Sequence, residues 1–478
     1  MAQDASRAYT SSQERPMDRL RCALIACAGL TVIDRLLIGL VLAIGLYAFD
    51  DLALSTLLPS VATELAGDGL YGASFLAFLL SNLASLVAAG YWIDRVGVVR
   101  PFAVAITLFC AGLLLGMLAP SMTVFVLGRA LQGLGGGAMQ AVVSAVIVIV
   151  WQGAARQRAI SWATTSWMVP ALVGPLVAGG VSQHGNWRYV FAGLIVLALL
   201  TLVLVLPRLP RADRERAGAA EGTPLPLRAV HDALGIALGT GIALFGLNRG
   251  GYAGSAALLL GVAVLWRPLQ ASLPAGFWAA RSSLAAALLL RLFACAVFFG
   301  LEAWLPWTLQ RTGLASPLVA GLILSASATS WTAATWWVDG ALARVGALRI
   351  LWIASAFMLL GSGLACLALN YYASISRAFC AWAIAGLGMG LCYPVVATLA
   401  MACAEPGREG HLSMMMGLTN TLGITAAIGI GAAVLRADES GALTRMMGIW
   451  QGFVLLALSL PLILWWRQTQ FETAPDKD

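Results

Sequence analysis

The sequence predicts an all-α polytopic membrane protein, with fourteen transmembrane helices in two six-helix bundles and an extra two-helix hairpin between them. The chain of 478 residues is 60% hydrophobic and 11% charged, whereas soluble domains are about 45–50% apolar and about 25% charged. Its apolar runs reach the roughly 20 residues that a helix needs to cross a bilayer core. Short motifs of the first half also return about 250 residues later.

The N-terminal bundle is expected to occupy residues 36–207. Backbone amides and carbonyls inside lipid must bond within their own segment, so long apolar runs there fold as helices. Polar or arginine-bearing breaks separate six such runs. These lie near residues 36–59, 70–92, 101–119, 122–150, 157–181 and 188–207.

The segment that follows, residues 208–283, combines a charged cytoplasmic linker with two apolar runs at about 230–247 and 252–266. The second run has only about 15 residues, so the sequence leaves open whether this hairpin fully spans the bilayer. Six further runs predict a C-terminal bundle at 284–466. They lie near residues 284–309, 317–342, 348–370, 377–403, 411–435 and 442–466.

The basic residues predict the orientation. If both termini are cytoplasmic, 21 of the 29 basic residues lie on the cytoplasmic side and six on the other, which is a strong positive-inside bias. The remaining two, Arg129 and Arg291, lie within spans, and we expect Arg291 to reach back to the cytoplasmic surface. Residues 1–35 are expected to form a cytoplasmic tail with an interfacial helix, and residues 467–478 a second cytoplasmic tail.

Several classes of function are excluded by residue content. The only lysine is Lys477, so the chain has no phosphate-binding loop of the GxxxxGK[ST] type and does not itself use ATP. The eight cysteines stand singly, without metal-ligand spacing, which predicts no metal site and no cofactor. The three histidines are isolated, so we do not expect an enzyme or catalytic residues. The basic residues are spread along the chain, which argues against a nucleic-acid partner.

Two short motifs reveal an internal repeat. Residues 95–100 read RVGVVR and residues 344–349 read RVGALR, an offset of 249. Residues 133–137 read GLGGG and residues 386–390 read GLGMG, an offset of 253. Two matches at nearly one offset predict two bundles of related structure.

Charged residues inside the spans are the candidate functional residues, because a charge at the bilayer centre is costly and normally faces a partner or a cavity. At about 1.5 Å per residue, Asp50 and Arg129 both lie about 10 Å below the outer face of the core. Equal depth predicts an Asp50–Arg129 pair or a shared water-filled path, with Asp51 beside it. The repeat also relates Asp50 to Glu302, so we expect carboxylates of the two bundles to face each other. If the helix ended early, Glu302 would instead lie at the surface.

Four segments resemble motifs of the major facilitator superfamily. Residues Gly90, Asp94, Arg95, Gly97 and Arg100 resemble the signature of its helix 2–3 loop. Arg129, Gln132 and Gly133 resemble the RxxQGxG motif of the fourth helix. Gly174, Pro175 and Gly179 resemble a fifth-helix motif of its proton-driven antiporters, and the segment from Asp50 to Pro59 resembles a motif of the fourteen-helix drug:proton antiporter branch.

This resemblance implies the major facilitator fold and proton-coupled export of small lipophilic compounds or drugs, by alternating access across the cell (inner) membrane. The implied partners are a small-molecule substrate, protons and the lipid bilayer. A proton-coupled or facilitative carrier of one metabolite or lipid is the alternative.

Two of these motifs also have a physical interpretation. Gly90 is expected to let helices approach closely, while Asp94 accepts hydrogen bonds or pairs with an arginine so that the cytoplasmic face closes. Gly174 and Pro175 break the helical hydrogen-bond ladder in mid-membrane. The sequence leaves open whether they serve packing alone or a seal against proton leak.

Overall fold

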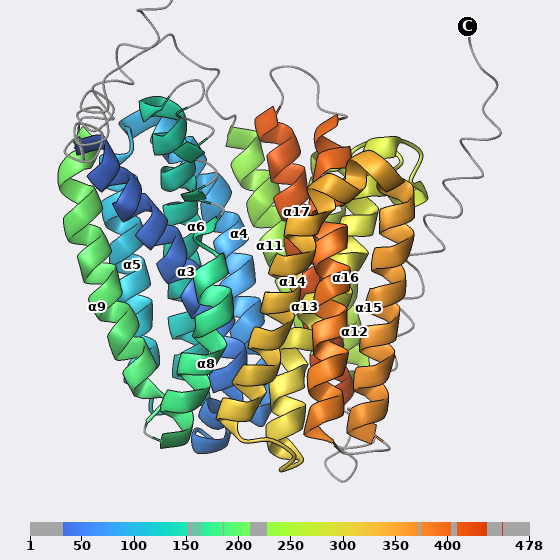
Figure 1. The fold of residues 1–478 in the computed structure, drawn as a ribbon. Coiled ribbons are helices and arrows are strands. Elements are labelled where there is room, and N and C mark those ends of the chain that lie inside the picture. The colour runs from blue at the N-terminus through green and yellow to red at the C-terminus, as the bar shows by residue number, and fades with distance from the viewer. Residues whose placement is uncertain are drawn as a thin grey trace, which may run out of the picture.

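The computed structural model describes residues 32–151, 165–184, 186–210, 227–370, 374–402 and 409–436, with isolated positions between 155 and 163 and at 452. The first bundle contains six described α-helices (Figure 1). These are α3 (Val32–Glu64), α4 (Tyr71–Val96), α5 (Val99–Met117), α6 (Met122–Val150), α8 (Met168–His184) and α9 (Arg188–Val205).

The second bundle contains five described helices, and the extra hairpin two. The hairpin consists of α11 (Leu227–Arg249) and α12 (Gly251–Ser272). The bundle consists of α13 (Ser283–Arg311), α14 (Pro317–Val345), α15 (Ala347–Asn370), α16 (Ile375–Ala402) and α17 (Glu409–Arg436). We call the end of the molecule at which α13 stops the Arg311 end, and the end at which α4 stops the Arg95 end.

The helix count needs a correction. The described residues hold thirteen α-helices, so they do not support the predicted count of fourteen. Each of the thirteen corresponds to a predicted span, and twelve are long and apolar enough to cross a membrane. The predicted span at 442–466 lies outside the described residues, as do the interfacial helix of the N-terminal tail and most of the charged linker.

The repeat predicted from sequence is confirmed by the way glycines pack. A Cβ on Gly133 of α6 would lie 2.3 Å from the Phe78 carbonyl oxygen of α4, and one on Gly386 of α16 would lie 2.4 Å from the Ser327 oxygen of α14. Only glycine permits such a close approach of two helices. Two more pairs of glycines correspond in this way. Gly135 packs on α5 as Gly388 packs on α15, and Gly137 packs on α4 as Gly390 packs on α14.

The two short loops of the repeat also match. Gly97 after α4 has φ of 82° and Gly346 after α14 has φ of 84°. Residues other than glycine rarely adopt this left-handed region, because Cβ collides with the backbone there. The second loop therefore turns its chain as the first does.

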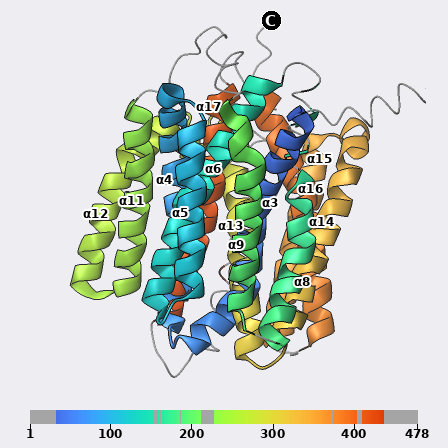
Figure 2. The same cartoon turned by 90° about the vertical axis from the view of Figure 1, so that its left-hand side faces the viewer.

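The hairpin α11–α12 is longer than its apolar runs suggested. Both helices qualify as membrane spans, with 20 and 22 residues in the apolar segments. A Cβ on Gly261 would lie 2.2 Å from the Ala243 nitrogen, so the two helices pack tightly against each other. The helix α11 lies between α4 and α17, and α12 lies outside it (Figure 2). The hairpin therefore covers one flank of the contact between the bundles.

Candidate functional site

The buried charges of the first bundle form an ion pair. Arg129 of α6 places one terminal nitrogen 2.7 Å from Oδ2 of Asp50 in α3, and both side chains are almost fully buried. The sequence placed Asp50 and Arg129 at the same depth in the bilayer core, and the structure pairs them.

The surroundings of Arg129 fix its guanidinium group. The nitrogen that bonds Asp50 also donates to Oε1 of Gln132 at 2.7 Å. The guanidinium carbon lies 4.1 Å from the centre of the Phe78 ring, close enough for a cation–π contact. Nε and the other terminal nitrogen have no hydrogen-bond partner among the described residues. Such buried donors are ready to bind water or a ligand.

A second acidic pair lies where the two bundles meet. Asp51 of α3 and Glu302 of α13 are both half-buried, and the charge of Asp51 acts on Glu302. The positive charge of Arg129 also acts on the carboxylate of Asp51. The repeat offset relates Asp50 to Glu302, whereas the carboxylate whose charge acts on Glu302 is that of the next residue, Asp51. Glu302 lies within α13, nine residues before its end, and not at the surface.

The Arg311 end of the molecule is held shut by contacts between the bundles. The Tyr71 hydroxyl donates to the Ala303 carbonyl at 2.6 Å, and the Tyr71 ring lies 4.9 Å from that of Trp304. Arg311 pairs with Asp68 at 3.0 Å. Nε2 of Gln310 donates to the carbonyl of Thr56 at 3.1 Å, and its oxygen accepts from Ser60.

The fifth-helix motif takes part in this closure. A Cβ on Gly179 of α8 would lie 2.4 Å from the Pro317 oxygen, and one on Gly321 of α14 would lie 2.2 Å from the Pro175 oxygen. Each bundle thus presents one glycine to the backbone of the other. Gly174 meets only ordinary contacts, the nearest at 3.8 Å. Tight packing between bundles is therefore observed for this motif.

Among the described side chains of the loop motif at the Arg95 end, Arg95 and Arg100 form no ion pair with the second bundle. A Cβ on Gly90 would meet nothing within 4 Å, so the predicted close helix approach at this glycine is wrong for this conformation. Arg95 stacks 3.5 Å above the Tyr91 ring of its own helix, and Arg100 is exposed. The side chain of Asp94 lies outside the described residues.

Arg291 was misjudged from the sequence. We expected its side chain to reach the surface, but only 7% of the residue is exposed. It donates to the Tyr393 hydroxyl in α16 and, at 3.2 Å, to the Met416 carbonyl in α17. No motif or repeat marks these partners, which lie on two other helices, α16 and α17.

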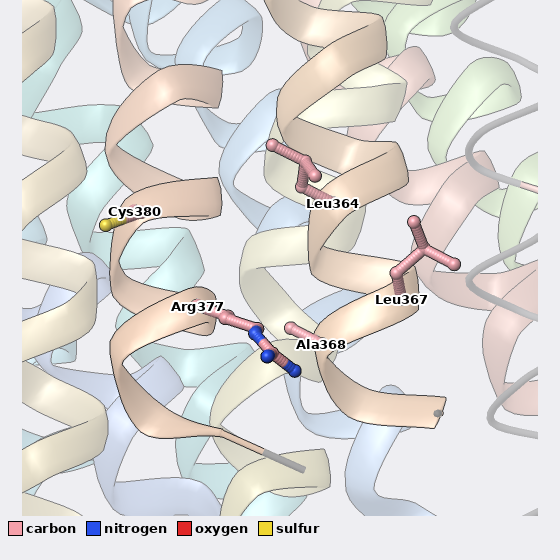
Figure 3. Close-up of a pocket in the computed structure, with 5 residues that line it drawn as sticks. All are labelled: Leu364, Leu367, Ala368, Arg377 and Cys380. Carbon is pink, nitrogen blue, oxygen red and sulfur yellow. The ribbon is translucent and has the colours of Figure 1, made fainter. Parts of the chain in front are cut away.

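A shallow groove of about 280 Å³ lies on the flank of the second bundle, between α15 and α16 (Figure 3). Its lining combines apolar side chains with one arginine at the start of α16. The lining residues are Leu364, Leu367, Ala368, Arg377 and Cys380. Leu364 and Leu367 are exposed on the outer surface. The groove is therefore separate from the buried charges described above.

The fold and its buried charges define a multi-pass membrane protein made of two related bundles. The family model described as the Major Facilitator Superfamily matches residues 40–432. The chain belongs to the Major Facilitator Superfamily and is a membrane transporter of small-molecule substrates.

Named relatives agree with this membership. A probable multidrug-efflux transporter of Mycobacterium tuberculosis is 25% identical over 436 residues, which cover 87% of this chain and 90% of the relative. A multidrug efflux pump of Staphylococcus aureus is 22% identical over 169 residues, which cover 35% of this chain and 38% of the pump.

Solved structures show the same fold. The xylose transporter XylE from E. coli matches with a TM-score of 0.62 and 14% identity, over 91% of this chain and 99% of that one. The POT family transporter PepTSo matches with a TM-score of 0.66 and 15% identity, over 91% of this chain and 99% of that one.

Proposed function

We propose that this transporter exports small lipophilic compounds in exchange for protons, by alternating access. The observation that carries the proposal is the group of acidic side chains around Arg129. One arginine faces Asp50 and Asp51, and Glu302 lies opposite Asp51 across the contact between the bundles. A single cation does not neutralise three carboxylates, so protons have acceptors at the point where the bundles move against each other.

Protonation would act on the contacts between the bundles. A proton on Glu302 or Asp51 removes the repulsion between them, which favours contact of α3 with α13. A proton on Asp50 removes the charge that holds Arg129, so that its guanidinium becomes available to other partners. The order of these steps decides which end of the molecule opens.

The proposed location is the cell (inner) membrane. The proposed orientation places both termini in the cytoplasm. The Arg95 end then faces the cytoplasm and the Arg311 end faces outward. In this orientation the described conformation is closed on the outer side. The proposed layout is residues 36–207 and 284–466 as bundles, with 208–283 as linker and hairpin and with a fourteenth helix at 442–466.

Two carboxylate variants test the proton coupling. In everted membrane vesicles, Asp51→Asn and Glu302→Gln are expected to lose accumulation of a lipophilic fluorescent dye driven by a pH gradient. They are expected to keep exchange of labelled for unlabelled dye, because exchange needs no net proton transfer. Accumulation at the wild-type rate in both variants would sink the proposal.

The matched control is Asp232→Asn on α11. Asp232 is an acidic residue whose only described ion pair is a loose one with Arg228, at 3.8 Å, one helical turn away. This variant is expected to transport like the wild type. A panel of dyes and metabolites in the same vesicles separates a broad exporter from a carrier of one compound.

A further inference from the structure

Arg291 is a buried cation whose described partners are all neutral. It bonds the Tyr393 hydroxyl and the Met416 carbonyl, and its guanidinium carbon lies 4.0 Å from the centre of the Tyr393 ring. Its nitrogen Nη1 has no hydrogen-bond partner among the described residues. A buried charge without a counter-ion is strongly unfavourable, so the site favours an anion.

The second bundle has few acidic residues that could supply this anion. Its helices α13 to α17 contain only Glu302, Asp339 and Glu409. Glu302 is eleven residues from Arg291 on the same helix, about 16 Å along its axis, which is too far for an ion pair. The ion pairs found among the described side chains use other arginines. The side chains of Asp339 and Glu409 lie outside the described residues and enter the experiment below.

Aromatic rings continue from Arg291 toward Glu302. The Tyr393 ring lies 5.6 Å from that of Trp331, which lies 5.9 Å from that of Phe299. All three side chains are only partly buried, whereas Trp382 and Phe298 behind them are fully buried. The arginine thus stands at one end of an accessible aromatic surface.

We infer that Arg291, Tyr393, Trp331 and Phe299 bind a lipophilic organic anion, with its acidic group on Nη1 of Arg291 and its rings on the aromatic side chains. Guanidinium groups match the planar geometry of carboxylates, and aromatic faces bind apolar rings. The inference rests on the proposed export function and adds a substrate class to it. The acidic group of the anion lies about 16 Å from Glu302 along the axis of α13, so the charge of the substrate and the proton occupy separate places.

A matched pair of probes tests this site in the purified full-length protein. The probes are 1-pyrenebutyrate and its neutral amide, which differ in charge and hardly in shape, and binding is followed by quenching of tryptophan fluorescence. Arg291→Gln is expected to weaken binding of the carboxylate by about thirtyfold or more, the usual effect of truncating one partner of a buried charge pair. Binding of the amide is expected to stay unchanged.

Three further variants complete the design. Arg349→Gln removes an exposed arginine at the Arg95 end and is expected to bind both probes like the wild type. Asp339→Asn and Glu409→Gln are also expected to leave the carboxylate affinity unchanged. A gain of tenfold or more in either acidic variant would identify an internal counter-ion of Arg291 and overturn the proposal.

Equal weakening of both probes by Arg291→Gln would show a packing role and overturn the proposal as well. The assay uses no proton gradient, so its outcome is independent of proton coupling. If Glu302→Gln abolishes coupling while Arg291→Gln leaves carboxylate binding intact, the proposed function stands and the anion site fails. If Glu302→Gln leaves coupling intact while Arg291→Gln weakens carboxylate binding alone, the anion site stands and the proposed proton coupling fails.

Discussion

Replacing Arg129 with glutamine is expected to abolish transport and to lower the free energy of unfolding by about 3–5 kcal/mol. The reason is that Asp50 would remain as a buried charge without its partner at 2.7 Å, and breaking a buried pair on one side has this cost. The loss is measured as a lower midpoint of thermal unfolding in detergent, together with substrate accumulation in vesicles.

The double variant Asp50→Asn, Arg129→Gln separates stability from function. It removes both charges of the buried pair, so most of the stability is expected to return, while transport stays absent because Arg129 can no longer switch between Asp50 and other partners. Arg188→Gln serves as the control, because its pair with Glu64 is partly exposed and such pairs contribute about 0–1 kcal/mol. A double variant no more stable than Arg129→Gln would contradict this account of the pair.

Adding side chains where α8 crosses α14 is expected to hold the Arg311 end open. In Gly179→Ala and Gly321→Ala the new Cβ would lie 2.4 Å and 2.2 Å from backbone oxygens of the other bundle. Overpacking of this kind costs about 1–3 kcal/mol, which shifts the population of the closed state by roughly 5- to 150-fold. The shift is measured as faster maleimide labelling of a cysteine placed at Ser60, in a chain whose native cysteines are replaced.

The neighbouring glycine supplies the control for this experiment. A Cβ on Gly180 would meet only the Leu318 side chain, at 3.8 Å, which is ordinary contact. Gly180→Ala is therefore expected to label and transport like the wild type. If Gly179→Ala and Gly180→Ala label at the same rate, the crossing of α8 and α14 does not control closure at the Arg311 end.

Much of the site could be predicted from the sequence, because the fixed thickness of the bilayer core converts residue number along a span into depth. Counting residues along apolar spans placed Asp50 and Arg129 at one depth, and the structure pairs them. Depth does not give direction, however. Neighbouring residues on an α-helix point about 100° apart, so packing decides whether Asp50 or Asp51 turns toward α13. The repeat therefore related Glu302 to Asp50, one residue before the carboxylate whose charge acts on it.

The surroundings of Arg291 could not be predicted in the same way. Its partners Tyr393 and Met416 belong to helices far along the chain, and neither lies in a recognisable motif. The repeat gave no help, because the first bundle has no charged residue at the corresponding place. Only the packing of α13, α16 and α17 shows that this arginine is buried rather than extended to the surface.

The hairpin α11–α12 makes the two sides of the transporter unequal for molecules dissolved in the lipid. On one side α11 contacts both α4 and α17, and α12 covers α11, with Tyr252 and Leu259 of α12 99% and 71% exposed. A compound that diffuses within the membrane meets α12 there and not the junction of the bundles. On the opposite side, among the helices that the structure describes, α8 and α14 bring the two bundles together. A compound that approaches from the lipid on this side therefore meets the crossing of Gly179 and Gly321.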